Sequence, residues 1–81
     1  MQKEGASKGV PDLFLAVPAS HIDWAGLWIE MKSPKGKLSA EQKDWHQRLK
    51  SHGYAVMVCR SAREAILTIC EYLRLPWELK I

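Results

Sequence analysis

The chain has 81 residues, enough for one small domain, and its 47% hydrophobic and 26% charged residues are typical of a globular protein rather than a disordered one. The net charge of +3 is compatible with a polyanionic partner without identifying one. No apolar run approaches the roughly 20 residues of a membrane span, and the N-terminus lacks the apolar core of a signal peptide. We therefore expect one domain over residues 1–81, with no membrane segment.

Residues 1–9 are polar and contain glycine, which predicts a loop or a frayed N-terminal arm. Val10 and Pro11 begin the first predicted strand, because proline lacks an amide hydrogen and fits the entry of a strand better than its middle. Residues 12–17 are almost continuously apolar, which is typical of a strand covered on both faces. Residues 18–26 then predict a rather long hairpin connection.

The second predicted strand is a short apolar run with period-two alternation, Gly-Leu-Trp-Ile-Glu-Met-Lys at 26–32. Successive side chains of a strand point to opposite faces, so Trp28, Glu30 and Lys32 share one face. A carboxylate and an ammonium on that face cost desolvation energy unless something pairs with them. An ion pair between Glu30 and Lys32 is the simplest explanation of the tripeptide.

A turn and a capped helix follow. Residues 33–37, Ser-Pro-Lys-Gly-Lys, predict the turn. Ser39 with Gln42 three residues later forms a capping box, which predicts a helix to about Ser51. Gly53 is the expected left-handed stop of this helix.

The first helix has a narrow apolar stripe of Trp45 and Leu49. Residues 54–59 are apolar on both faces and predict a third strand at the centre of the sheet. Ser61-Ala-Arg-Glu is a second capping box, which predicts a helix to about Leu73. Its wide apolar stripe comprises Ala62, Ala65, Ile66, Ile69, Cys70 and Leu73.

The order β-β-α-β-α predicts an α/β sandwich. The second and third strands are joined through a helix, so they should lie parallel with a right-handed crossover. A proline at position 76 ends the last helix and leaves residues 74–81 as a C-terminal tail. We expect Cys59 and Cys70 to be reduced thiols packed in the interior.

The charged residues of the first two strands predict a site. If these strands are antiparallel, Asp12 at the start of one approaches Glu30 and Lys32 toward the end of the other. Two carboxylates at such short range repel each other unless a cation lies between them. Carboxylate oxygens suit a hard divalent ion such as Mg²⁺ or Mn²⁺, which polarises phosphoryl oxygens and lowers the pKa of bound water.

Three segments in this order carry a family resemblance: Gly-Val-Pro-Asp at 9–12, Ile-Glu-Met-Lys at 29–32 and Gly-Lys-Leu-Ser-x-x-Gln at 36–42. They resemble the PD-(D/E)xK nuclease superfamily, and most closely its VRR-NUC (virus-type replication-repair nuclease) domain, including small stand-alone phage versions. The resemblance covers about residues 8 to 59. It implies a restriction-endonuclease-like β-β-α-β-α core, with a mixed sheet of about three strands flanked by helices.

The resemblance also implies roles for particular residues. Asp12, Glu30 and the main-chain carbonyl of Met31 would be ligands of Mg²⁺ or Mn²⁺, Lys32 the catalytic lysine, and Gln42 a helix residue facing the site. The implied reaction is hydrolysis of a DNA phosphodiester that leaves a 5′-phosphate, selective for branched DNA such as Holliday junctions. Gln42 is equally explained by capping of its helix, and both roles can hold.

Other polar and aromatic residues have two interpretations each. Phosphate contact and a solvated surface are the alternatives for four cations: Lys8, Lys35, Lys37 and Arg48. We expect His21 and His46 at the surface rather than as ligands. Trp24, Trp45 and Trp77 are expected to pack in the core or at a subunit seam rather than to stack on bases.

Members of the family usually carry an acidic residue on a helix upstream of the Gly-x-Pro-Asp motif. Only eleven residues precede Asp12 here, and Glu4 is the acidic residue among them. Either that helix is missing from this sequence or the minimal version functions without it. Two rival hypotheses therefore stand beside the nuclease: a non-catalytic DNA-binding module, and an assembly domain in which Glu30 and Lys32 form a structural ion pair.

Assembly and location follow from the same sequence. Trp77, Leu79 and Ile81 come after a helix-ending proline with nothing beyond them to cover them. Such patches usually mark an interface, so we expect a homodimer, with exchange of strands or helices between subunits as a further expectation. The resemblance implies a cytoplasmic phage or prophage product in a bacterial host.

Overall fold

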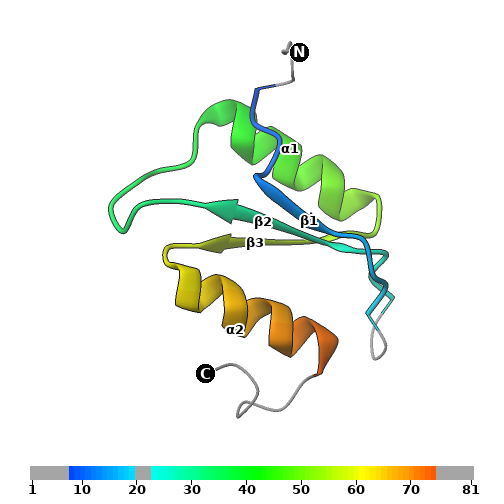
Figure 1. Ribbon diagram of the computed structural model, residues 1–81. Coiled ribbons are helices and arrows are strands. Elements are labelled where there is room, and N and C mark those ends of the chain that lie inside the picture. The colour runs from blue at the N-terminus through cyan, green and yellow to red at the C-terminus, as the bar shows by residue number, and fades with distance from the viewer. Residues whose placement is uncertain (1–7, 20–22, 75–81) are drawn as a thin grey trace, which may run out of the picture.

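The computed structural model describes residues 8–19 and 23–74. The elements in chain order are β1 (Leu13–Leu15), β2 (Leu27–Met31), α1 (Ala40–Ser51), β3 (Ala55–Cys59) and α2 (Ala62–Leu73). They form an α/β sandwich in which the sheet lies between the two helices (Figure 1). This is the expected β-β-α-β-α order of a restriction-endonuclease-like fold. Neither helix is long and apolar enough to cross a membrane.

The sheet is mixed, with strand order β1-β2-β3. β1 and β2 are antiparallel, with Leu13 opposite Ile29, while β2 and β3 are parallel, with Leu27 opposite Ala55. The antiparallel register places residue 12, just before β1, beside the end of β2. The sequence prediction of both strand pairings is confirmed.

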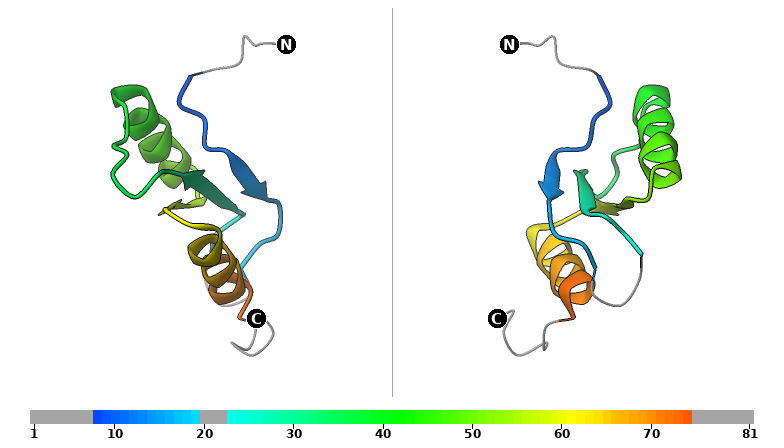
Figure 2. Two further views of the ribbon diagram at one scale, coloured as in Figure 1. Left: turned by 60° about the vertical axis from the view of Figure 1, so that its left-hand side comes forward. Right: turned by 90° about the vertical axis from the view of Figure 1, so that its right-hand side faces the viewer.

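The two faces of β2 meet different helices, as its alternation predicts. Leu27 and Ile29 are almost fully buried in a core that includes Ala65 and Tyr72 of α2. Glu30 points to the other face and is hydrogen-bonded to side chains of α1. Figure 2 shows the helices on opposite sides of the sheet. Each face of the central strand is therefore covered by one helix.

The first helix begins and ends where its capping signals predict. The Ser39 hydroxyl accepts a hydrogen bond from the Gln42 amide, and the Gln42 side chain accepts one from the Ser39 amide. Gly53 follows the helix with φ 92°. α2 departs from this pattern: Ser61 caps it, but the Glu64 carboxylate accepts from the amide of Arg60, one residue before the cap. The second capping box is therefore only half formed.

Two predictions about the strands are wrong. β1 comprises three residues rather than the predicted run from Val10 to residue 17, and it lies at an edge of the sheet (Figure 2), with Leu13 49% and Phe14 44% exposed. β3 lies at the other edge, with Met57 46% exposed, and β2 is the central strand. A continuous apolar run predicts a strand, but it does not show whether that strand lies at the centre or at an edge of the sheet. At an edge, some of the apolar side chains can remain exposed.

Helix burial also differs in part from the expected stripes. On α1, Trp45 and Leu49 are only half-buried, whereas His46 is buried. On α2, Ile66 is 44% exposed, and Tyr72 is buried instead, its hydroxyl donating to the carbonyl of Val17. The two cysteines are free and buried, as predicted.

Candidate active site

The Gly-x-Pro-Asp segment is held against the first turn of α1. Gly9 has φ 91°, a backbone conformation that favours glycine. A Cβ at this position would lie 2.6 Å from the carbonyl carbon of Glu41. Pro11 is buried, and the next residue, Asp12, accepts a hydrogen bond at Oδ2 from the amide of Met31, 2.8 Å away. The close approach at Gly9 and this hydrogen bond together fix the Asp12 carboxylate beside the end of β2.

Glu30 is the buried carboxylate of the site, with 2% of its surface exposed. Its Oε2 accepts a hydrogen bond from Gln42 Nε2 at 3.2 Å, and its Oε1 lies 3.3 Å from His46 Nε2. Gln42 thus performs both roles that its sequence position allows, since its amide oxygen closes the helix cap while its amide nitrogen faces the site. The Gln42 side chain therefore connects the start of α1 to the Glu30 carboxylate through hydrogen bonds.

The electrostatics favour a cation near these carboxylates. Burial raises the pKa of Glu30 above the ordinary 4.5, the hydrogen bond from His46 opposes the rise, and the Asp12 carboxylate adds to it. Within residues 8–19 and 23–74, no lysine or arginine forms an ion pair with Asp12 or Glu30, and the side chains hydrogen-bonded to Glu30 are those of Gln42 and His46. This negative charge is not neutralised by the described part of the chain.

Lys32 does not pair with Glu30, contrary to the simplest explanation of the tripeptide. Its amide donates to the carbonyl of Cys59 at 2.9 Å, which extends the β2–β3 pairing by one residue. The side chain is half-buried, and its Cδ runs close to the turn at Gly36. Its ammonium therefore remains unpaired within the described residues, on the strand face that carries Glu30.

The donor chemistry fits a hard divalent cation. Of the two carboxylates, Asp12 directly precedes β1 and Glu30 lies in the neighbouring β2, and Mg²⁺ typically binds one or two carboxylates while keeping several waters. No group of three or more His, Cys, Asp or Glu suited to a metal occurs within the described ranges, so a closed protein cage is not the arrangement found there. Main-chain oxygen, water and phosphate oxygen are the remaining ligand types for such an ion.

Arg60, the residue after β3, forms hydrogen bonds with the basic turn between β2 and α1, residues 33–37. Its Nη1 donates to the carbonyls of Ser33, at 2.8 Å, and Gly36, at 2.7 Å. The turn carries two of the predicted DNA contacts, Lys35 and Lys37, both exposed. Because Arg60 follows a strand parallel to β2, it joins the carboxyl ends of both strands.

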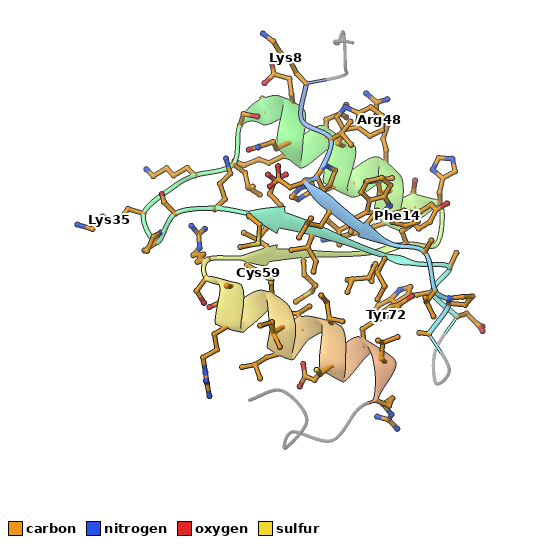
Figure 3. The ribbon with its side chains drawn as sticks, viewed as in Figure 1. Lys8, Phe14, Lys35, Arg48, Cys59 and Tyr72 are labelled. Atoms are coloured by element: carbon orange, nitrogen blue, oxygen red, sulfur yellow. The ribbon has the colours of Figure 1, made fainter. Side chains whose placement is uncertain are left out.

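The four predicted DNA contacts do not form one cluster. Lys35 extends from the tip of the turn, whereas Arg48 lies toward the opposite end of α1 (Figure 3). The Arg48 guanidinium pairs with Asp44 and stacks over Trp45, 5.2 Å from the ring centroid. Lys8 is exposed beyond the start of α1. Arg48 is therefore already engaged within its own helix, whereas neither Lys35 nor Lys37 forms an ion pair among the described residues.

Comparison with known proteins identifies the class of this domain. Residues 2–63 match the profile of the VRR-NUC domain, most of the chain's length, so the chain belongs to the VRR-NUC family, a family of nuclease-type domains. A solved structure described as a VRR_NUC domain protein is 30% identical and superposes with a TM-score of 0.72. The match covers 88% of this chain and 57% of that one, so this chain spans little more than half of that neighbour's length. A search of curated proteins gave no match.

Two residues of this region were not predicted from the sequence. His46 was expected at the surface, yet it is buried beside Glu30, and its spacing of four from Gln42 places both on one helix face. That spacing is the signal that would have identified it. Arg60 follows an apolar strand, and nothing in its local sequence indicates contact with a turn 24 to 27 residues earlier. Glu4, His21 and Trp77 lie outside the described residues.

Proposed function

We propose that this chain is a Mg²⁺- or Mn²⁺-dependent DNA endonuclease that hydrolyses phosphodiester bonds. One observation carries the proposal: Asp12 and the buried Glu30 come together at the junction of β1 and β2, with no lysine or arginine of the described residues neutralising them. Membership of a nuclease-type family supports the same chemistry. A buried carboxylate beside another, without a neutralising partner, costs stability, and a cation shared by both offsets that cost.

Each site residue has a proposed role. Asp12, Glu30 and the main-chain carbonyl of Met31 would hold the metal. When bound, a divalent ion polarises a phosphoryl oxygen and lowers the pKa of water. Lys32 would orient the attacking water or stabilise the negative charge that develops on the phosphate, because its ammonium is not paired with Glu30. Gln42 would keep Glu30 in position from the start of α1.

The proposed substrate is branched DNA, such as a four-way junction, and the proposed product carries a 5′-phosphate. Lys35 and Lys37 would contact the DNA backbone on one side of the site. The hydrogen bonds from Arg60 to the carbonyls of Ser33 and Gly36 would hold the turn that carries these lysines. Lys8 would contact it beyond the start of α1. A two-fold homodimer would present two sites to the two symmetry-related strands of a junction.

Cleavage of a labelled four-way junction and of a linear duplex, with Mg²⁺, Mn²⁺ or a chelator, tests this function. We expect metal-dependent cuts in the junction by the wild type. Lys32→Ala should cut more slowly by about 10², the scale for loss of one electrostatic partner of the transition state. Arg63→Ala removes an exposed cation of α2 and is the matched control.

Three other outcomes have definite meanings. Binding of the junction without cleavage at any metal concentration supports the non-catalytic DNA-binding module instead. Absence of both binding and cleavage supports an assembly domain. Cleavage by Lys32→Ala at the wild-type rate removes Lys32 from the mechanism.

A further inference from the structure

The geometry points to His46 as a positioning residue of the proposed active site, which holds Glu30 in the orientation needed to bind a divalent cation. This inference rests on the proposed function. His46 is 6% exposed and stands 3.3 Å from Glu30 Oε1 through Nε2. A histidine buried against a buried carboxylate requires an explanation that core packing alone does not give.

His46 and Gln42 hold Glu30 at two points. Gln42 Nε2 donates to one carboxylate oxygen and His46 reaches the other, so rotation of the carboxylate about its terminal bond breaks both contacts. Gln42 is itself held by the helix cap through Ser39. The free lone pairs of Glu30 are consequently fixed in direction before any cation arrives, which is how outer hydrogen-bond partners tune metal sites.

The chemical type of both partners matters for cation binding. An amide and an imidazole each donate a hydrogen bond without needing a positive charge. A lysine or arginine in either place would neutralise Glu30 and compete with the cation. Gln42 and His46 therefore satisfy the buried carboxylate while leaving its negative charge available, and no lysine or arginine of the described segments replaces them in that role.

Two substitutions separate positioning from packing. His46→Leu replaces the imidazole with an apolar side chain of moderate volume and removes the contact to Glu30. His46→Gln keeps a nitrogen donor at about the reach of Nε2. Gln47→Leu changes the next residue, which is exposed on the same helix, and controls for a leucine on α1.

Binding of Mn²⁺ alone, measured from the loss of the free-ion signal in electron paramagnetic resonance, needs no substrate and no cleavage. We expect His46→Leu to weaken Mn²⁺ affinity by about 10- to 100-fold, the range for loss of an outer hydrogen-bond partner. His46→Gln should restore the affinity to within about threefold of the wild type, and Gln47→Leu should leave it unchanged. Near-ultraviolet circular dichroism establishes that each variant is folded.

The outcomes separate this inference from the proposed function. Wild-type affinity in a folded His46→Leu protein overturns the inference and leaves the nuclease proposal standing. If His46→Leu does not fold, His46→Gln decides the matter. Retained Mn²⁺ affinity in His46→Gln supports the positioning role. Loss of Mn²⁺ affinity in a folded His46→Gln protein overturns it. Absence of Mn²⁺ binding by the wild type at millimolar concentration overturns the metal-dependent function and this inference together.

Discussion

At the scale of single residues, the negative charge of the buried Glu30 carboxylate should lower the stability of the metal-free protein. Its carboxylate is almost fully buried near a second carboxylate, and its pKa is raised mainly by that burial. Glu30→Gln keeps the shape and the hydrogen-bonding partners but removes the charge. We expect the metal-free Glu30→Gln protein to be more stable than the wild type at pH 8, and to lose cleavage.

The pH dependence of this difference follows from the direction of the pKa shift. A carboxyl whose pKa is higher in the folded state binds more protons when folded, so the wild type loses stability as pH rises through that range. The gain from Glu30→Gln should therefore be absent below about pH 4.5 and fully present above the raised pKa. Chemical denaturation in a chelator between pH 4 and 8 measures it. Glu71→Gln, an exposed acid on α2, should show no such trend.

Gly9 and Gly53 provide a second prediction at this scale, because a comparison of the two separates the cost of backbone strain from the cost of steric crowding. Gly9 and Gly53 have nearly the same φ, 91° and 92°, but a Cβ meets backbone only at Gly9. Gly53→Ala should lose about 1 kcal/mol from strain in the left-handed conformation. Gly9→Ala should lose about 3 kcal/mol, because crowding against α1 adds to that strain. Equal losses in urea unfolding would contradict the close approach at Gly9.

At the scale of elements, the basic turn depends on a single side chain from the β3–α2 junction. Arg60→Ala removes the hydrogen bonds to the carbonyls of Ser33 and Gly36 and should cost about 1 kcal/mol, since the site is exposed. DNA affinity should fall more than it does for Arg63→Ala, which removes the same charge without touching the turn. Fluorescence anisotropy with labelled DNA at fixed salt compares them. Equal losses of affinity would mean that the turn needs no support from Arg60.

The elements also show what the sequence could predict. The alternation in β2 and the antiparallel pairing of β1 were sufficient to predict that Asp12 lies beside the end of β2, because they depend on local pattern and on pairing of strands that follow one another in the chain. The capping box predicted the start of α1 for the same reason. The edge position of β1 and the contact of Arg60 with a turn 24 to 27 residues earlier depend on which elements pack together, and a one-dimensional pattern does not contain that information.

At the scale of the whole molecule, the exposed apolar surface of the sheet edges supports the proposed homodimer. Leu13, Phe14 and Val17 are each at least 40% exposed along β1 and the residue run that follows it. A second copy of the chain would cover such a surface. Light scattering across micromolar concentrations should give the mass of two chains. The mass of one chain at every concentration would contradict the dimer.

The proposed function of the whole molecule depends on a divalent cation shared by Asp12 and Glu30. The most direct test is the thermal midpoint of the wild type, Asp12→Asn and Asp23→Asn as Mg²⁺ or Mn²⁺ is added. Asn at position 12 can still accept the hydrogen bond from the Met31 amide, so the variant should stay folded. Asp23 is exposed in the loop before β2 and serves as the matched control.

A cation that binds only the folded state at ten times its dissociation constant adds about 1.4 kcal/mol, which is roughly 5–10 °C for a domain of this size. We expect that rise in the wild type and in Asp23→Asn, and none in Asp12→Asn. A wild-type midpoint that does not move at millimolar metal, or an equal rise in Asp12→Asn, would contradict a cation shared by Asp12 and Glu30.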